Sequence, residues 1–209
     1  MKNIVVDGTE GSISVEKTLQ IVQSDVAKLP TRYGTFKIKA YGDGPQEHLA
    51  IMSQDFSSLN DPIVRIHSEC LTGDAIGSLK CDCNNQLDYA LKMISEKGGM
   101  VIYHRQEGRN IGLVNKVNAY KLQDEGYNTI EANKKLGFKA DERDYRAIGF
   151  ILKDLEVTQI RLVTNNPRKI TYIENLGIDI IQRIPAITEV QTYNQRYLQV
   201  KKNQMGHLL

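Results

Sequence analysis

The sequence predicts a mixed α/β fold. Its apolar residues follow a strand period in the first half of the chain and alternate between helix and strand patterns in the second. Residues 34–42, 48–54 and 62–68 alternate or run apolar, and the GDGPQE segment between the first two carries hairpin-turn residues. From residue 84 onward, helical and strand patterns take turns, which favours parallel crossover units. We therefore expect a strand-rich N-terminal half followed by alternating helices and strands in one compact domain.

Four helices are expected in the second half, at residues 84–98, 112–126, 143–155 and 167–177. Three short apolar strands accompany them, at residues 100–104, 159–164 and 178–184. Asn84 is the candidate cap of the first helix and Gly98 its end. Pro167 occupies the first turn of the last helix, where proline is favoured.

Residues 1–28 are expected to form an N-terminal extension ahead of a main domain at residues 29–209. Ser14 can cap a helix there. Five apolar residues recur at spacings of four and three, which places them on one helical face: Val15, Leu19, Val22, Val26 and Leu29. This pattern predicts an amphipathic helix lying on the domain, with a subunit contact as the alternative.

The composition is that of a soluble globular protein, with 41% hydrophobic and 25% charged residues. A net charge of +2 gives no reason to expect nucleic acid as a partner. No apolar run approaches the roughly 20 residues that cross a bilayer, and the N-terminus lacks the order of a signal peptide. We expect a cytoplasmic protein without a membrane partner, in a compartment where thiols stay free.

All three cysteines fall within one 14-residue window, at Cys70, Cys81 and Cys83. An odd number of clustered cysteines in a reducing compartment favours a metal site over disulfides. Three thiolates supply three of the four positions of a tetrahedral zinc shell. The fourth position either stays open for water, whose pKa zinc lowers to about 7, or is closed by His67 as a structural site. Buried cysteines without metal are the third alternative.

Two polar loops lie between a strand and a helix, where α/β folds place ligands. The first, YHRQEGRNIG, carries Arg105 and Arg109 and is either a solvated turn or a phosphate-binding loop. The second, TNNPRKI, puts Arg168 and Lys169 in the first turn of a helix, where cations oppose the helix dipole unless an anion is bound. An ordinary strand-to-helix turn is the alternative for this loop.

Two further segments carry reactive side chains. GFKADERDY places Asp141 and Arg143 before a helix; acids are common there, but a carboxylate beside an arginine can also serve in acid–base chemistry. Tyr120 follows Leu113 and Val117 by seven and three residues, a spacing that favours packing in the core.

Six strings, in this order over about residues 29–209, resemble the GTP cyclohydrolase II family: RIHSECLTGDAIGSLKCDC, YHRQEGRNIGL, YKLQDEGYNTIEAN, GFKADERDY, TNNPRK and KKNQMGHLL. The resemblance implies the enzyme that begins riboflavin biosynthesis. It implies zinc-dependent hydrolysis of GTP that opens the imidazole ring and releases formate and pyrophosphate, giving 2,5-diamino-6-(5-phosphoribosylamino)pyrimidin-4(3H)-one. It also implies a homodimer with one zinc ion per subunit, and magnesium bound with the triphosphate.

The resemblance assigns roles to individual residues. Zinc would be bound by Cys70, Cys81 and Cys83, with His67 in the neighbouring substrate loop rather than in the metal shell. GTP would be bound by Arg65, Ile66, His67, Ser68, Glu69, Gln86, Glu107, Gly108, Arg109, Thr129, Thr164 and Lys169. Asp141 matches the family's proton acceptor, Arg143 its assigned nucleophile, and Tyr120 a tyrosine implicated in the chemistry.

The nucleophile role conflicts with the chemistry of arginine, which stays protonated because its pKa lies above about 12. Our alternative hypothesis is that Arg143 clamps the phosphate or stabilises the charge that develops on it.

Two other functions remain open, a zinc-dependent hydrolase of another purine nucleotide and a zinc-stapled purine-nucleotide-binding protein without turnover. The low net charge and the absence of tryptophan weigh against the related possibility of an RNA-binding module. Residues 1–28 are too short for the dihydroxybutanone phosphate synthase domain that is often fused ahead of this family, so a single activity is expected.

Overall fold

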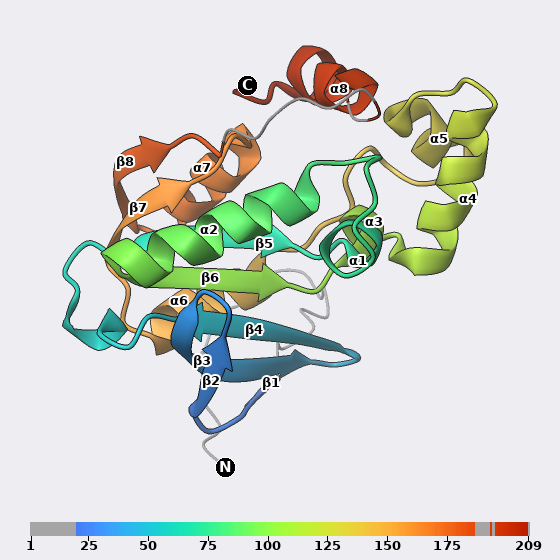
Figure 1. Ribbon diagram of the computed structural model, residues 1–209. Helices are drawn as coiled ribbons and strands as arrows, with labels where there is room; N and C mark the ends of the chain where they lie inside the picture. Colours follow the sequence, from blue (N-terminus) through green and yellow to red (C-terminus); the bar gives the residue numbers. More distant parts are fainter. Residues whose placement is uncertain (1–19, 187–192, 194, 209) are drawn as a thin grey trace, which may run out of the picture.

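A mixed β-sheet of eight strands runs through the part of the chain that the computed structural model describes, residues 20–186, 193 and 195–208 (Figure 1). The strands are β1 (Ile21–Gln23), β2 (Ala27–Thr31), β3 (Gly34–Asp43), β4 (Gln46–Met52), β5 (Ile63–Ser68), β6 (Gly99–His104), β7 (Gln159–Val163) and β8 (Asp179–Ile184). The helices are η1 (Phe56–Ser58), α1 (Leu71–Asp74), α2 (Cys83–Lys97), α3 (Glu107–Asn110), α4 (Gly112–Asp124), α5 (Thr129–Lys135), α6 (Arg146–Asp154), α7 (Pro167–Asn175) and α8 (Gln195–Met205). This architecture confirms the predicted mixed α/β fold.

The sheet changes from antiparallel to parallel halfway across. Its order is β1-β3-β4-β6-β5-β7-β8, with β2 also paired to β3. The pairs that involve β1 to β4 are antiparallel, including β4 with β6. The strands β6, β5, β7 and β8 pair in parallel, and α2 and α7 connect β5 to β6 and β7 to β8 as the predicted crossover units require. Parallel strands bring their carboxyl ends to one edge of the sheet, which is where ligands bind in such folds.

Apolar side chains pack on both faces of the sheet. Alternate residues of a strand point to opposite faces, so Ile66 of β5 joins Ile102 of β6 under α6 and α7. Ile63 and Val101 point the other way and pack with Ile94 of α2. Figure 1 shows α2 lying across this second face. The two helical layers fix the sheet and hold its carboxyl-terminal edge in place.

The parallel pair of β5 and β6 begins with a close backbone approach. Gly99 has a φ of +144°, and a Cβ at this position would lie 2.1 Å from the carbonyl oxygen of Ile63. Only glycine tolerates both the backbone conformation and the contact.

The predicted helix of the N-terminal extension is wrong where the structure describes it. The segment forms β1 and β2, which pair with β3, and Val22 and Val26 are exposed. Ser24 adds to the pairing, since its backbone N–H donates to the carbonyl oxygen of Ala40 at 3.0 Å. The long edge of β3 satisfies these backbone groups, whereas a short solitary helix is marginal in water. Residues 14–19 lie outside the described part, and the division between extension and main domain stays a prediction.

The helices differ from the predictions in several places, and α6 begins at Arg146, three residues later than predicted. α2 begins one residue before Asn84, so Asn84 does not cap it; its side-chain amide donates to the carbonyl oxygen of Asp74 at 3.1 Å. The sequence patterns do not predict α5, although Asn128 and Glu131 form a capping box at its start. Asn166 caps α7, and Pro167 lies in its first turn as predicted. Across the described residues, we find no helix with the length and apolarity needed to span a bilayer.

Candidate active site

A cavity of about 150 Å³ lies where β5, β6 and β7 end. Its walls come from the loops after these three strands, from the start of α2 and from α4. Lys201 and His207, close to the C-terminal end of the described residues, complete the lining. The position agrees with the rule that parallel sheets bind ligands at the carboxyl ends of their strands.

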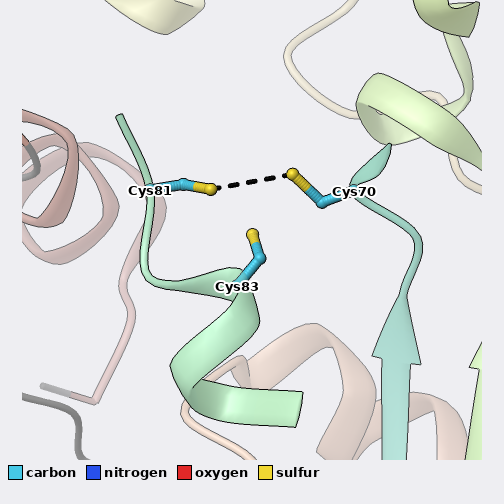
Figure 2. A group of neighbouring side chains, drawn as sticks. All are labelled: Cys70, Cys81 and Cys83. Atoms are coloured by element: carbon cyan, nitrogen blue, oxygen red, sulfur yellow. Dashed lines mark hydrogen bonds between the residues drawn. The ribbon is translucent and has the colours of Figure 1, made fainter. Parts of the chain in front are cut away.

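The three cysteines meet at one wall of this cavity, with their sulfur atoms turned toward one another (Figure 2). Cys70 follows β5, whereas Cys81 and Cys83 lie at the start of α2. Their sulfur atoms all lie within 4.8 Å of one another, and the Sγ atoms of Cys70 and Cys81 are 3.6 Å apart. A tetrahedral zinc ion with Zn–S bonds of about 2.3 Å requires sulfurs about 3.8 Å apart. The spacing of Cys70 and Cys81 therefore fits two ligands of one zinc ion, and Cys83 lies close enough to be the third.

The protonation of the cluster also suits a bound cation. Hydrogen bonds from Cys81 and Cys83 lower the pKa of Cys70 far below its usual value, with Lys116 assisting. Hydrogen bonding to Cys70 raises the pKa of Cys81 to about 11, and the same cause raises that of Cys83. Without a cation, only one of the three thiols ionises readily, whereas a divalent metal binds all three as thiolates.

Gly73 in α1 leaves the room that the cluster needs. A Cβ at Gly73 would lie 2.8 Å from the Sγ of Cys81 and 3.1 Å from that of Cys70. Any other residue would push into the space between the sulfurs. The thiol donors, their spacing and this glycine together match a zinc site.

His67 does not complete the metal shell, so the structure contradicts the closed Cys3His alternative. Its Nε2 lies 3.1 Å from a carboxylate oxygen of Asp74, and among the described residues the candidate metal group holds only the three cysteines. The same carboxylate oxygen accepts from the backbone N–H of Cys70 at 3.0 Å and from the hydroxyl of Tyr103 at 2.8 Å. Burial lowers the pKa of His67. Asp74 therefore orients both Cys70 and a neutral histidine.

Lys116 of α4 joins the cluster to the loop after β6. It is 8% exposed, and its ammonium donates to the Sγ of Cys70 at 3.0 Å and to Glu107 at 2.7 Å. Burial opposes its charge, but Glu107 and Cys70 outweigh burial and raise its pKa. The other oxygen of Glu107 accepts from the backbone N–H of Leu71 at 2.7 Å. A charged donor to a thiolate ligand tunes the metal that the thiolate holds.

The loop after β6 holds a strained turn. Gly108, Arg109 and Asn110 have φ values of 61°, 63° and 72°, in the left-handed region that non-glycine residues rarely adopt. Arg109 donates to the carbonyl oxygen of Ala140 at 3.0 Å, and the amide of Asn110 donates to that of Glu142 at 3.2 Å. These bonds hold the strained loop against the segment before α6 and keep it at the cavity wall.

Cations dominate the cavity. Among the described residues, seven lysine or arginine side chains line it against two carboxylates, those of Glu69 and Glu107. The seven are Arg65, Lys80, Arg109, Lys116, Arg143, Lys169 and Lys201. Carboxylates pair with four of the seven, Lys80, Lys116, Arg143 and Lys201, and the other three favour an anionic ligand in this partly enclosed space.

Two of these cations are deeply buried without a carboxylate partner among the described residues. Lys169 is 5% exposed and donates to the carbonyl oxygen of Ile66 at 2.8 Å; burial, followed by the charges of Arg143 and Arg65, lowers its pKa far below the usual value. Burial lowers the pKa of Arg65 to about 10, and its buried Nε has no hydrogen-bond partner in the part of the chain that the structure describes. Buried charges of this kind are costly unless a ligand pairs with them.

Asp141 and Arg143 form a bidentate pair. The Nε and Nη2 of Arg143 donate to the two carboxylate oxygens at 2.8 and 2.6 Å, and Nη1 donates to the hydroxyl of Ser68 at 2.9 Å. Burial disfavours the charge of Asp141, but hydrogen bonds and charge from Arg143 outweigh it and lower the pKa to about 2. The carboxylate is therefore ionised at neutral pH, and it is a very weak base.

The cavity brings together all but two of the residues that the resemblance singles out. Those that line it are Arg65, His67, Ser68, Glu69, Cys70, Cys81, Cys83, Gln86, Glu107, Gly108, Arg109, Tyr120, Thr129, Arg143, Thr164 and Lys169. The side chain of Ile66 instead points into the core on the other face of the sheet. Asp141 lies behind Arg143 and does not line the cavity.

Tyr120 lines the cavity rather than packing with Leu113 and Val117, which are 39% and 52% exposed. Its hydroxyl lies 3.1 Å from that of Thr72, and burial raises its pKa to about 12. The predicted core face of α4 is therefore wrong, because the face that carries Lys116 and Tyr120 is the one turned inward.

Sequence patterns missed four residues that belong to this site, namely Asp74, Lys116, Lys201 and His207. A lysine inside a helix normally reaches solvent, so nothing local distinguishes Lys116. The signal for Lys201 and His207 is the tail string KKNQMGHLL, which carries no chemistry at a recognisable spacing.

The fold and the site define an α/β protein in which three thiols that could hold a metal ion lie beside a cavity lined by lysine and arginine side chains. A family model of GTP cyclohydrolase II matches residues 22–185. The chain belongs to the GTP cyclohydrolase II family, and it is an enzyme.

Several relatives align over most of the chain. The GTP cyclohydrolase-2 of Campylobacter hominis is 55% identical over 192 residues, which cover 91% of this chain and 97% of the relative. The enzyme of the same name from Campylobacter fetus subsp. fetus is 57% identical with the same coverage. The riboflavin biosynthesis protein RibBA of Synechocystis is 50% identical over 194 residues, which cover 90% of this chain and 35% of that protein.

Proposed function

We propose that the protein hydrolyses GTP at the imidazole ring of guanine, with zinc bound by Cys70, Cys81 and Cys83. Formate and pyrophosphate would be released, leaving 2,5-diamino-6-(5-phosphoribosylamino)pyrimidin-4(3H)-one as the first intermediate of riboflavin biosynthesis. The observation that carries the proposal is a thiol triad with zinc spacing in the wall of a strongly cationic cavity. Relatives named GTP cyclohydrolase-2 at 55–57% identity support it.

The main chemical difficulty of this reaction is that C8 of guanine is a poor electrophile, and a bound metal would overcome it. Zinc with an open position acts as a Lewis acid and lowers the pKa of water, so that attack becomes feasible at neutral pH. The chain's part is to hold the thiolates and to tune them, through Asp74 on the Cys70 backbone and Lys116 on its sulfur.

The triphosphate would be held by cations that have no other strong partner. Lys169 and Arg65 are the best candidates, since both are buried and neither pairs with a carboxylate among the described residues. Arg109 adds a charge from the strained loop. Magnesium bound with the triphosphate would offset part of its negative charge, and it would need few ligands from the chain.

Arg143 would act as an electrostatic clamp on the phosphate rather than as a nucleophile. Asp141 holds two of its nitrogens, and a carboxylate with a pKa of about 2 cannot take a proton from a guanidinium at neutral pH. Arg143 therefore stays charged and is fixed in orientation, which suits stabilisation of charge at phosphorus. Asp141 would position it.

Tyr120 would serve as a neutral hydrogen-bond donor beside the metal. Its raised pKa keeps the hydroxyl protonated at neutral pH, and Thr72 orients it at 3.1 Å. The proposal further includes a cytoplasmic homodimer with one zinc ion per subunit, consistent with three free cysteines in a reducing compartment.

The proposal is tested by incubating zinc- and magnesium-loaded protein with GTP and measuring formate, pyrophosphate and the absorbance of the pyrimidine product. Formate from GTP, with none from ATP, is the expected result. Cys81→Ser protein, which lacks one metal ligand, is the matched control and should release none. Tight GTP binding without formate release would instead support a purine-nucleotide-binding protein without turnover.

A further inference from the structure

The C-terminal segment, residues 198–208, contributes to the cavity although it lies beyond the family match, which ends at residue 185. It includes most of α8, which Figure 1 shows on the far side of α2 from the antiparallel strands. Two of its side chains, Lys201 and His207, line the cavity.

Two hydrogen bonds tie the C-terminal segment to two different parts of the site. The ammonium of Lys201 donates to Asp82 at 2.9 Å, and these side chains are only 11% and 1% exposed. In the sequence, Asp82 lies between Cys81 and Cys83, two of the three proposed metal ligands. The backbone N–H of Leu208 donates to the carbonyl oxygen of Asn165 at 2.9 Å, in the loop before α7. The segment thus bridges the metal wall and the wall that holds Lys169.

His207 lies between these two anchors and faces the cationic part of the cavity. Its backbone N–H donates to the carbonyl oxygen of Lys201 at 3.0 Å. Burial, and then the charges of Lys201, Lys169, Arg109 and Arg143, lower the pKa of its ring to about 3. A neutral imidazole still offers an N–H donor, and the surrounding cations mark the place where an anion would be most stable.

We propose that His207 is a binding residue for the polyphosphate of a nucleotide, and that Lys201 is the positioning residue that holds the C-terminal segment against the site. The ligand class rests on the proposed function. In this arrangement the C-terminal segment forms a wall of the nucleotide pocket, so that nucleotide binding and docking of the segment stabilise each other.

The proposal is tested on the full chain with His207→Ala, Lys201→Met, Lys201→Arg and, as the matched control, Lys202→Met, which changes the exposed neighbouring lysine of α8. The probes are guanosine and a guanosine triphosphate analogue with a methylene bridge between the α and β phosphorus atoms. Dissociation constants are measured by calorimetry, together with zinc content and melting temperature.

We expect His207→Ala to weaken binding of the triphosphate analogue about tenfold or more, the usual effect of losing a hydrogen bond to a charged group, and to leave guanosine binding within twofold. Lys201→Met should weaken the analogue similarly, Lys201→Arg should restore most of the affinity, and Lys202→Met should match the wild type. A merely structural role would weaken both ligands equally.

Wild-type affinity for the analogue in zinc-replete, folded His207→Ala protein would overturn the binding role. Equal effects of Lys201→Met and Lys202→Met would overturn the positioning role. A wild-type protein that binds the analogue but releases no formate from GTP refutes the proposed function alone, and the variants still decide the role of the C-terminal segment. A wild-type protein that binds no guanine nucleotide refutes both.

Discussion

The pairing of Asp141 with Arg143 predicts how the stability of the protein depends on pH. The perturbation is Asp141→Asn, which keeps the shape of the side chain and removes its charge. The carboxylate accepts from two nitrogens of Arg143 and lies 3.1 Å from Arg168, and its side chain is 3% exposed. Solvent therefore screens this interaction little.

The magnitude follows from the pKa. Folding lowers the pKa of Asp141 from its usual 3.8 to about 2. Since a tenfold change in acidity corresponds to about 1.4 kcal/mol, the interaction stabilises the folded state by about 2.5 kcal/mol at pH 7. A lowered pKa gives stability that is present above about pH 4 and is lost as pH falls through 2. The same relation leaves about 1.3 kcal/mol at pH 3.

The assay is urea unfolding of the wild type and of Asp141→Asn at pH 7, 5, 4 and 3, followed by circular dichroism. The quantity of interest is the difference in unfolding free energy between the two proteins at each pH, because loss of metal common to both cancels in it. We expect a difference of about 2.5 kcal/mol at pH 7 and 5 that is roughly halved by pH 3.

A difference below about 0.5 kcal/mol at pH 7 would refute the reasoning, since the pair would then contribute no more than an exposed salt bridge. A difference that does not fall between pH 5 and pH 3 would also refute it, because the loss would then come from packing rather than from charge.

Three more outcomes are expected. Cys83→Ser should reduce the zinc content after dialysis from about one ion per chain to near zero by atomic absorption, and retained zinc would exclude this ligand set. Lys116→Met should lower kcat by about 10- to 100-fold with metal retained, and should move the sulfur-to-cobalt band of cobalt-loaded protein to longer wavelength; Lys121→Met, an exposed change on the same helix, should do neither. Gly99→Ala should cost at least about 3 kcal/mol of unfolding free energy, against about 1 kcal/mol for Gly44→Ala, where a Cβ meets nothing within 4 Å; similar costs at both positions would contradict the close contact at the start of β6.

Local sequence patterns predict most of the helices and strands in the second half of the chain. The segments 84–98 and 167–177, with their terminal glycines and first-turn proline, became α2 and α7 within a few residues. The helix prediction for residues 22–29 is wrong because an apolar spacing of four and three fits one face of a helix, whereas exposed strands at a sheet edge need no such pattern. What decided between them was the open edge of β3, a pairing partner that the periodicity of the segment itself cannot reveal.

The candidate site, like the fold, could be predicted only in part from local sequence patterns. The three cysteines and the two loops rich in arginine and lysine carry their chemistry in their spacing, and the structure gathers them around one cavity. Lys116 is 46 residues from Cys70, and only the packing of α4 against the loop after β5 brings its ammonium to the sulfur. Asp74 is likewise an ordinary acid in sequence, and its role depends on the turn that aims it at Cys70 and His67.

The sheet changes from antiparallel to parallel pairing, and this change affects the order in which its strands come together during folding. β3 and β4 are neighbours in the chain and pair as a hairpin. In contrast, β5, β6 and β7 are separated from one another by segments that contain whole helices. Local pairing closes sooner than distant pairing, so the hairpin should form early and the carboxyl-terminal edge last. Since the cavity is built on that late edge, we expect a newly made chain to acquire its hairpin well before it becomes competent for catalysis.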